Sequence, residues 1–392
     1  MSEDRREKRI SPREQKRKKR KRRKIALVIE LLVLVVLCGV LFVYSKLGKI
    51  NYRDTGKAAT NDLDDDAVKK LKGYTTIALL GVDSRDMESD KGSRSDSIMV
   101  AVLDNDKKKI RLMSVYRDSY LDIDGKGTFK KCNVAYARGG AKGAIEMLNR
   151  NIDLDIQDYV SVNWKALADA IDAVGGLTVD VSEAEAKSMG PEDYHNTIYD
   201  TSLTVGRKTQ NWVKPGKQKL DGVQCVAYCR IRHNGVGEDF GRAGRQREIL
   251  SLLVDKIKKG GMSKLNKVMD VVLPEISTSL SMSEIVTFAK AGMEYDIDAT
   301  TGFPKYKRGA DFAGSVVVPC TLEKNVILAH KFLYNDDDYK MSNTLKAINN
   351  KIINKSGFTE KDAVDLGDAK YDTGNVGDLT TEDNENSSSG GK

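Results

Sequence analysis

The stretch Thr76-Ile77-Ala78-Leu79-Leu80-Gly81-Val82-Asp83 decides the fold, because a short apolar run that ends on a carboxylate is typical of a buried strand with a functional residue at its end. Two further apolar runs follow at Ser97–Leu103 and Ile110–Val115, and Asp104-Asn105-Asp106 between them predicts a tight turn. Strands joined by a hairpin run antiparallel, so the sequence predicts a mixed sheet rather than a purely parallel one.

Strand and helix patterns alternate along the rest of the chain. They predict an α/β fold in which helices cover a mixed central sheet. Further strands are expected at Tyr159–Asn163 and Leu177–Val181. Helices are expected at Ala141–Arg150, Lys165–Val174, Asp239–Lys259, Ser283–Met293, Glu323–Tyr334 and Met341–Asn354.

The N-terminus carries a topology signal. Arg5–Lys24 contains fourteen Lys or Arg, and the nineteen residues Ile25–Val43 are apolar apart from Glu30 and Gly39. A helix of that length crosses a bilayer core of roughly 30 Å, and basic flanks stay in the cytoplasm. We therefore predict a cytoplasmic segment (1–24), one transmembrane helix (25–45) and an extracellular remainder. The alternative is a cleaved signal peptide, which would have a shorter apolar core and a small-x-small cleavage site.

The net charge of +8 comes from this N-terminal segment. Residues 1–24 hold fourteen bases and four acids, whereas the remainder holds 51 bases and 53 acids, a net charge of −2. No nucleic acid is expected as a partner of such a body, and the basic segment is expected to contact membrane lipid. Residues 46–72 are predicted to be an extracellular linker, 73–354 the folded domain, and 355–392 a mostly disordered polar tail.

The cysteines and histidines give weak signals. Beyond the predicted span no CxxC pair or Cys/His ligand spacing occurs, so a zinc site is not expected. Disulfides are chemically allowed outside the membrane, and the sequence leaves pairing and free buried thiols equally open. His233 is interpreted as a loop residue rather than a catalytic base. The cysteines concerned are Cys132, Cys225, Cys229 and Cys320.

Two acids and two arginines follow the first strand closely: Asp83, Arg85, Arg94 and Asp96. Ligands of open α/β sheets bind beyond the carboxyl ends of strands. Facing carboxylates repel each other unless a cation or a proton lies between them, and arginines bind phosphate through paired hydrogen bonds. The loop therefore predicts a divalent metal together with a phosphate ligand.

A second polar cluster lies on the long helix predicted at Asp239–Lys259. Asp239, Arg242 and Gln246 share one narrow sector at about 100° per residue, and an apolar stripe continues along the same face. Charges that face the interior must be paired or must bind something. The cluster is therefore either an Asp239–Arg242 ion pair that only fixes the fold, or part of an anion site.

Neighbouring basic residues favour the anion site. Arg230 and Arg232 lie just upstream of the helix, and Arg117 ends the third strand at the sheet edge that also carries Asp83. Lys131 either reaches a phosphate or is solvated, and the sequence does not separate the two. Two more basic residues of the helix lie off the buried sector and are predicted to be surface residues: Arg245 and Arg247.

Eight pieces of sequence occur in one order behind the predicted span: Leu79–Arg85, Arg94–Asp96, Ser114–Asp118, Lys131–Gly140, Ile171–Asp180, Leu220–Gly222, Tyr228–Arg232 and Asp239–Gln246. Between Thr75 and about Leu252 the chain thereby resembles the LytR–CpsA–Psr family of Gram-positive cell-wall enzymes. Two positions depart from the family pattern: Tyr116 stands where the family usually has Pro, and Cys132 where it usually has an aliphatic residue.

The resemblance implies an α/β/α layered domain with an apolar tunnel for a polyprenyl chain. It implies transfer of a glycopolymer, of teichoic acid or capsule type, from a polyprenyl-pyrophosphate carrier onto peptidoglycan, at the outer face of the cell membrane. It also implies that Asp83 and Asp96 bind Mg²⁺, with Mn²⁺ as the second choice. The implied pyrophosphate ligands are Arg94, Arg117, Arg230, Arg232 and Arg242, with Arg85, Lys131, Asp239 and Gln246 lining the same site.

Three other functions compete with this expectation. A polyprenyl-pyrophosphate hydrolase would use water as the acceptor at the same site. A non-catalytic protein that binds lipid-linked glycan would not need the Asp83/Asp96 pair and the full set of arginines. A transcriptional attenuator would need contact with nucleic acid, which the predicted topology and the charge of −2 beyond residue 24 disfavour.

Overall fold

The computed structural model describes residues 50–83, 92–191, 197–209, 212–233, 235–364 and 372–373. The predicted cytoplasmic segment and transmembrane helix lie outside these ranges, as do Cys38 and Arg85. Within the described ranges no helix is both long enough and apolar enough to cross a membrane.

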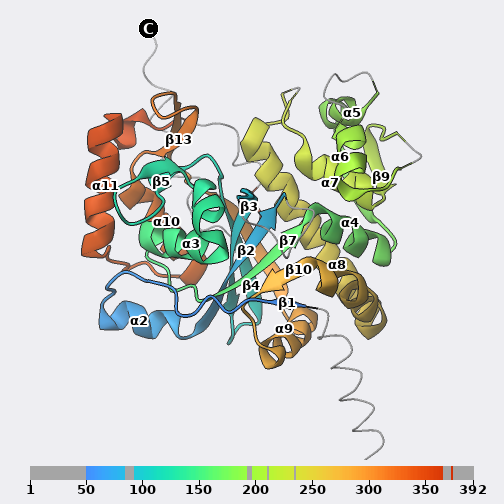
Figure 1. Cartoon of the computed structure of the whole chain (residues 1–392), viewed down its shortest axis with the longest axis horizontal. Coiled ribbons are helices and arrows are strands. Elements are labelled where there is room, and N and C mark those ends of the chain that lie inside the picture. Colours follow the sequence, from blue (N-terminus) through green and yellow to red (C-terminus); the bar gives the residue numbers. More distant parts are fainter. Residues whose placement is uncertain are drawn as a thin grey trace, which may run out of the picture. The chain divides into compact units, whose positions relative to one another are not determined.

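A seven-stranded mixed sheet forms the centre of the domain, as predicted, in the order β1-β10-β7-β2-β3-β4-β11 (Figure 1). Strands β2, β3 and β4 pair antiparallel, whereas β7 and β11 join them in parallel on either side. The strands are β1 (Asn51–Tyr52), β2 (Tyr74–Val82), β3 (Ser95–Asp104), β4 (Lys109–Val115), β7 (Asp158–Asn163), β10 (Ile276–Thr278) and β11 (Asp296–Phe303).

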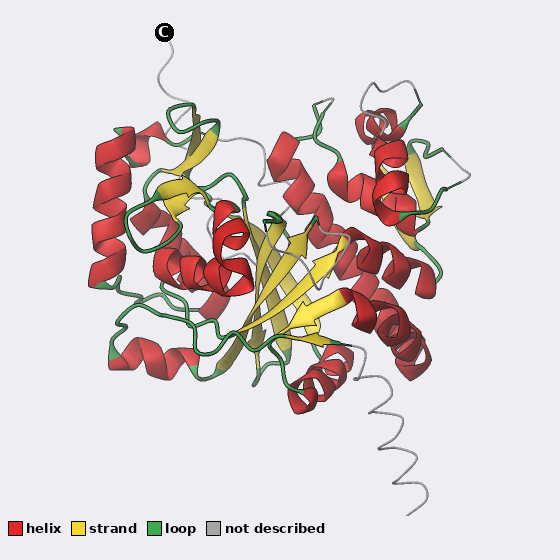
Figure 2. Ribbon diagram, in the orientation of Figure 1, coloured by secondary structure: helices red, strands yellow, loops and turns green. Residues whose placement is uncertain are grey.

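Helices cover both faces of this sheet (Figure 2). Successive side chains of a strand point to opposite faces. Accordingly Ala78 and Leu80 of β2 pack in the core formed with α3, α10 and α11, whereas Leu79 packs with Leu250 of α8 on the other face. These helices are α3 (Val134–Ile152), α8 (Glu238–Val272), α10 (Leu322–Tyr334) and α11 (Asn343–Ser356).

A second core lies where α8 packs against α4 and α7. Helix α7 is capped at its N-terminus by Asp221, whose carboxylate accepts from the backbone N–H of Gln224 in a capping box. Helix α8 is longer than predicted, and its two helical segments meet at Gly261, where φ is 63°. The remaining helices are α2 (Asp65–Leu71), α4 (Trp164–Ala173), α5 (Glu183–Met189), α6 (Thr197–Val205), α7 (Gly222–Arg230) and α9 (Met282–Glu294).

Three short two-stranded sheets complete the described part. The predicted strand Leu177–Val181 is β8, but it pairs with β9 outside the central sheet, which the sequence did not indicate. Its apolar residues instead fill the second core, because they alternate with exposed positions along the strand. The remaining strands are β5 (Tyr120–Asp122), β6 (Phe129–Lys131), β9 (Gly216–Leu220), β12 (Lys307–Ala310) and β13 (Val316–Pro319).

The stretch predicted as a linker belongs to the folded domain from residue 50 onward. Strand β1 pairs in parallel with β10, Ala58 is buried, and its backbone N–H donates to Gln157. The prediction of a linker was wrong here because backbone pairing and a single buried alanine leave no apolar pattern in the sequence. At the other end, Thr373 of the predicted tail forms a β-bridge with Thr300 of β11.

All four described cysteines are free and buried. Cys132 serves as packing, and its thiol lies 3.2 Å from the carbonyl oxygen of Tyr116. Tyr116 itself is buried against Phe240, and its backbone N–H donates to the carbonyl of Phe303, a bond that the usual proline could not make. Both departures from the family pattern are therefore accommodated by local packing.

Candidate functional site

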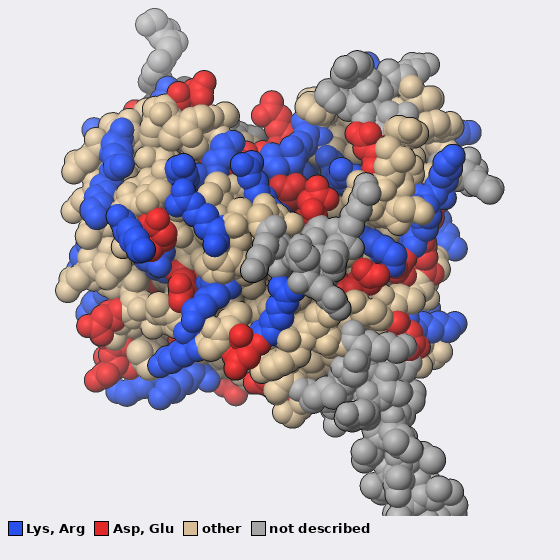
Figure 3. All heavy atoms as spheres, in the orientation of Figure 1, with Lys and Arg blue, Asp and Glu red and all other residues tan. Residues whose placement is uncertain are grey.

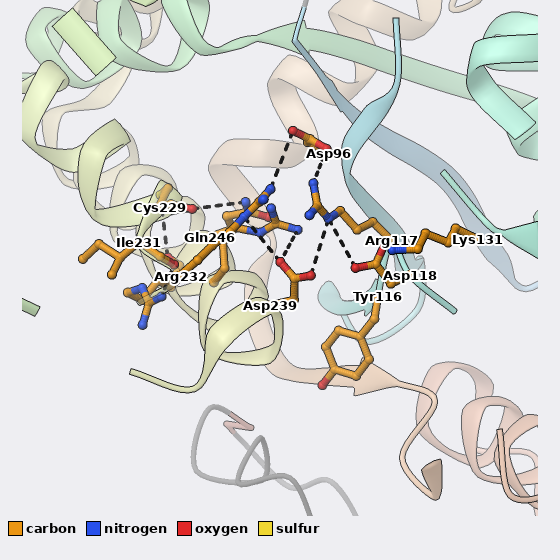
Figure 4. A network of polar contacts seen from close by, with 12 residues as sticks. Asp96, Tyr116, Arg117, Asp118, Lys131, Cys229, Ile231, Arg232, Asp239 and Gln246 are labelled. Carbon is orange, nitrogen blue, oxygen red and sulfur yellow. Dashed lines mark hydrogen bonds and ion pairs between the residues drawn. The ribbon is translucent and has the colours of Figure 1, made fainter. Parts of the chain in front are cut away.

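The site lies at one edge of the central sheet. Asp83 follows the last residue of β2, and Asp96 is the second residue of the antiparallel strand β3, so the two residues lie on neighbouring strands at one edge of the sheet. Arg117 follows β4 at the same edge, and its Nη1 lies 2.8 Å from Oδ1 of Asp96 (Figure 4). The sheet therefore brings two carboxylates and one guanidinium together, as predicted.

Helix α8 and the segment before it supply the other side of the site. Asp239 lies at the centre, with its carboxylate 3.1 Å from Nη2 of Arg242, 3.4 Å from Nε of Arg232 and 3.6 Å from Nε of Arg117. Arg232 also approaches Asp96 at 3.9 Å. Two carboxylates thus link three arginines into one network, drawn in Figure 4.

Burial and mutual charge shift the pKa values of this network. Burial alone would raise the pKa of Asp239, but Arg242 and its neighbours outweigh it and lower the pKa to about 2. Arg242 is buried, and the loss of water lowers its pKa to about 10, which still leaves it charged at neutral pH. The interior therefore holds a fixed set of ionised groups beside the sheet edge.

Asp118 adds a further carboxylate that the sequence reasoning did not select. It lies 3.0 Å from Nζ of Lys131, and burial followed by its hydrogen bond with Asp239 raises its pKa. Lys131 is therefore paired rather than freely solvated, and it lies beside the cluster.

Several buried polar atoms of the site lack a hydrogen bond within the described residues. They are two guanidinium donors, Nε of Arg117 and Nε of Arg242, and two acceptors, Oδ1 of Asp239 and Oδ1 of Asn133. Arg242 is only 4% exposed, and a buried donor without an acceptor costs free energy. Such donors are typical of sites that bind an anionic ligand.

Two cavities open at this edge, and they share Asp83, Asp96 and Arg117. The first, which we call the cationic cavity, has a volume of about 310 Å³ and is also lined by Arg230, Arg232 and Arg242. The second has a volume of about 410 Å³ and is also lined by Arg94, Asp118 and Lys131. Basic and acidic side chains gather in a hollow of the surface in Figure 3.

The structure therefore brings together nearly all of the predicted site residues. Gln246 lies beside the network, where its amide donates to the carbonyl of Cys229. Arg230 lines the cationic cavity, where its Nη1 donates to Thr201 and Thr204 of α6. Arg85 lies outside the described residues. The cationic cavity also contains four residues that were not predicted: Trp164, Thr197, Asp200 and His233.

Arg245 and Arg247 were predicted at the surface, and both are buried. Arg245 donates to the carbonyls of Tyr228 (3.0 Å), Ile231 (2.6 Å) and Val236 (2.9 Å). It thereby fixes the backbone that carries Arg230 and Arg232. The helical pattern missed it because α8 is enclosed on more than one side, and backbone carbonyl acceptors have no sequence signature.

The donor set at this edge fits a hard divalent cation. Asp83 and Asp96 line both cavities, and carboxylate oxygens are the ligands that Mg²⁺ prefers. Among the described residues no group of three or more Asp, Glu, His or Cys could hold a metal alone. A bound Mg²⁺ would therefore take two carboxylates from the protein and further oxygens from phosphate and water.

The LytR_cpsA_psr family model matches residues 38–302, which is more than half of the chain. The chain belongs to this family. One relative of this LytR–CpsA–Psr protein is the polyisoprenyl-teichoic acid–peptidoglycan teichoic acid transferase TagV of Bacillus subtilis, which is 30% identical over 60% of this chain and 57% of that protein. Another is TagU of Enterococcus faecalis, 30% identical over 59% of this chain and 68% of that protein.

Crystal structures of family relatives share the fold. TagV of B. subtilis superposes with a TM-score of 0.52 at 25% identity, over 69% of this chain and 99% of that one. A protein from E. faecalis described as a transcriptional regulator superposes with a TM-score of 0.54 at 26% identity, over 76% and 98%. The chain spans about three-fifths of the full length of the TagV relative.

Proposed function

We propose that this LytR–CpsA–Psr protein is a membrane-anchored phosphotransferase that moves a glycopolymer from a polyprenyl-pyrophosphate carrier onto peptidoglycan. The observation that carries the proposal is the cluster of Arg117, Arg232 and Arg242, which line the cationic cavity and are held by Asp96 and Asp239. Relatives named as teichoic acid transferases support it. The identity of the polymer is left as teichoic acid or a capsule-like polysaccharide.

The reaction needs charge neutralisation more than covalent help. A pyrophosphate diester carries negative charge on both phosphoryl groups, and planar guanidinium groups bind two oxygens each while staying charged. The bond that breaks joins the bridging oxygen to the phosphorus next to the sugar, and polyprenyl phosphate leaves with the electron pair. Donors already fixed in place would stabilise that leaving charge without reorganisation.

The charge balance of the site supports a metal cofactor. Among the described residues, the cavities and the network contain six basic residues, namely Arg94, Arg117, Lys131, Arg230, Arg232 and Arg242. Five carboxylates oppose them, namely Asp83, Asp96, Asp118, Asp200 and Asp239. Because the bases exceed the acids by one among these described residues, a doubly charged pyrophosphate would leave the set negative. Mg²⁺ held by Asp83 and Asp96, or Mn²⁺ in its place, would supply the missing positive charge.

The test is turnover of a polyprenyl-pyrophosphate-linked saccharide by the full chain with peptidoglycan fragments and Mg²⁺. We expect wild type to release polyprenyl phosphate, and Asp83→Ala or Asp96→Ala to lose Mg²⁺-dependent turnover while circular dichroism shows an intact fold. Arg232→Ala should chiefly weaken donor binding. Wild-type turnover in the two aspartate variants would contradict the assignment of the site.

A hydrolase is the second candidate, because water could enter the same cationic cavity. It would release polyprenyl phosphate together with free phosphorylated saccharide even when peptidoglycan fragments are present. The products of the same reaction therefore separate the two functions.

A further inference from the structure

A third opening meets the site at Asp83. This opening, which we call the outer groove, has a volume of about 310 Å³. It lies where the end of β7 and the start of α4 approach the end of α6, three elements that Figure 1 draws on the same flank of the sheet. Besides Asp83, the lining residues are Asn163, Trp164, Lys165, Leu203, Thr204, Val205 and Gly206.

The chemistry of the outer groove differs from that of the two cavities. Its described lining residues include no arginine, and the one basic residue among them, Lys165, pairs with Asp169 at 2.8 Å and with Glu275 at 2.9 Å. Leu203 is 54% exposed, so the groove offers apolar surface beside the indole of Trp164 and the polar groups of Asn163 and Thr204. Apolar and aromatic surface with a few polar groups suits a neutral saccharide, whose ring faces are apolar and whose edge carries hydroxyls.

The outer groove and the cationic cavity share a wall. Asp83 and Trp164 line both of them. Arg230, which lines the cationic cavity, donates to Thr204, which lines the groove, at 3.0 Å. Helix α6 therefore contributes residues to both spaces. A ligand in the groove and a phosphate in the cavity would therefore meet at Asp83.

The distribution of charge indicates which space suits the donor phosphates and which suits the acceptor. The phosphates of the donor belong in the cavities that carry six basic side chains, because those charges compensate them. A second substrate must approach the phosphorus from the side opposite to the leaving oxygen. The outer groove reaches Asp83 without a free cation among its described lining residues, so it is suited to an uncharged acceptor.

We propose that the outer groove is the acceptor subsite and that it binds a neutral peptidoglycan saccharide with one hydroxyl at Asp83. This inference rests on the proposed function. The hydroxyl oxygen forms the new bond to phosphorus, its proton passes to solvent water, and polyprenyl phosphate leaves with the electrons of the broken bond. In this proposal residues of α4 and α6 bind the acceptor, and residues of α8 and the sheet edge bind the donor.

Binding can be tested without turnover, because the chain contains two tryptophans, Trp164 and Trp212. Trp212 is 48% exposed and lines none of the three spaces, so Trp212→Phe leaves Trp164 as the reporter. In the full chain with this substitution, an uncharged peptidoglycan disaccharide should change the tryptophan fluorescence saturably. Adding Leu203→Glu should weaken that binding at least about tenfold, since it places an unpaired charge against the sugar. Adding Tyr199→Glu, on the same helix and 55% exposed, should leave it unchanged.

Kinetics on the otherwise wild-type chain give the second readout. Leu203→Glu should raise KM for the acceptor by about the same factor and leave the Kd of the pyrophosphate donor within about twofold. Weaker donor binding with an unchanged acceptor KM would mean that the groove holds the polyprenyl chain, and would overturn the inference. No fluorescence response to the saccharide would overturn it as well. Saccharide binding without any transfer by wild type would instead overturn the proposed function and keep the groove as a saccharide site.

Discussion

At the scale of single residues, Asp239 is the carboxylate on which three guanidinium groups converge, and its ionisation should appear in the stability of the protein. Its pKa is lowered from 3.8 to about 2 in the folded chain. A carboxyl group whose pKa is lower in the folded state stabilises the fold at pH values above its ordinary pKa. This stabilisation is lost as the pH falls through the pKa of the folded state. The stabilising effect should therefore disappear between about pH 4 and pH 2.

We predict that the difference in unfolding free energy between wild type and Asp239→Asn shrinks by roughly 2 kcal/mol over that pH window. Urea denaturation at several pH values measures it. The comparison with the variant cancels the titration of those carboxyl groups that do not contact Asp239. A difference that stays constant from pH 5 to pH 2 would show that Asp239 is not held by its arginines.

Arg245 belongs to the same scale, because it acts through other residues. Its hydrogen bonds to three carbonyls of residues 228–236 position the segment that carries Arg230 and Arg232. We predict that Arg245→Gln raises the Kd of the pyrophosphate donor by about tenfold and destabilises the fold by about 3 kcal/mol, since each charged hydrogen bond contributes about 1.5–3 kcal/mol. Arg245→Lys, which keeps the charge, should restore part of the binding.

Arg247 is the matched control for this prediction. It is as buried as Arg245 and lies on the same helix, but it donates to Thr300 and pairs with Asp372, away from the arginine segment. Arg247→Gln should reduce stability and leave donor binding unchanged. If the two variants change the donor Kd equally, the positioning role of Arg245 is wrong.

At the scale of elements, the close packing of α7 against α4 determines the position of Arg230, the last residue of α7. A Cβ atom at Gly222, the first residue of α7, would overlap the carbonyl of Ala168 on α4. We predict that Gly222→Ala forces the two helices apart and costs about 1–3 kcal/mol, as overpacking does. Thermal denaturation of the purified variants measures the change.

Gly139 provides the control for the substitution at Gly222. It lies in α3, and a Cβ there would meet nothing within 4 Å. Gly139→Ala should therefore be neutral or stabilising, because alanine favours a helix more than glycine does. Equal destabilisation by the two variants would mean that close helix packing does not explain Gly222.

The same scale shows why the sequence predicted some elements and missed others. Strands β2, β3 and β4 have continuous apolar runs bounded by turn residues, so their existence could be predicted, and the mixed sheet with it. Strand β1 is two residues long, and β10 has the three-residue sequence Ile-Ser-Thr. Both are too short to show the alternation of apolar and polar residues from which a strand is predicted. Helix α7 was missed because it is buried almost all round, which removes the polar face that marks an amphipathic helix.

The residues of the candidate site could likewise be predicted only where a local sequence pattern marks them. Asp83, Asp96 and Arg117 could be placed at one sheet edge because strand ends fix them, and Asp239 and Arg242 could be placed by helical spacing. Asp118 and Thr204 enter the site through tertiary contacts with Lys131 and Arg230, which leave no local pattern. The burial of Arg245 could not be predicted without the fold, since its hydrogen-bond acceptors are backbone carbonyls.

At the scale of the whole molecule, the folded domain begins before the predicted boundary at residue 73. Strand β1 and helix α2 precede that residue, and Asn61 donates to the carboxylate of Asp153 within the domain. We predict that a chain starting at Gly73 melts about 2 °C or more below one starting at Lys46, since removal of an edge strand and its buried contacts should cost about 1 kcal/mol or more, and a domain of this size shifts by only about 1–2 °C per kcal/mol. Equal melting temperatures would restore the interpretation of 46–72 as a linker.

The membrane anchor predicted at residues 25–45 would place the site at the outer surface of the cell membrane, where a lipid-linked donor is available. The arginine network, the acidic pair and the outer groove all open around Asp83, so one chain would hold donor, cation and acceptor together. This arrangement fits the proposed transfer between two substrates, which needs a place for each of them.

The most direct measurement is the linkage formed on peptidoglycan, analysed by mass spectrometry after the full chain has acted on a polyprenyl-pyrophosphate-linked saccharide with Mg²⁺. We predict that wild type joins the saccharide to peptidoglycan through one phosphodiester, with polyprenyl phosphate as the other product, and that Asp96→Ala does neither. Free phosphorylated saccharide as the sole sugar product, or tight donor binding without turnover, would contradict the proposed transfer.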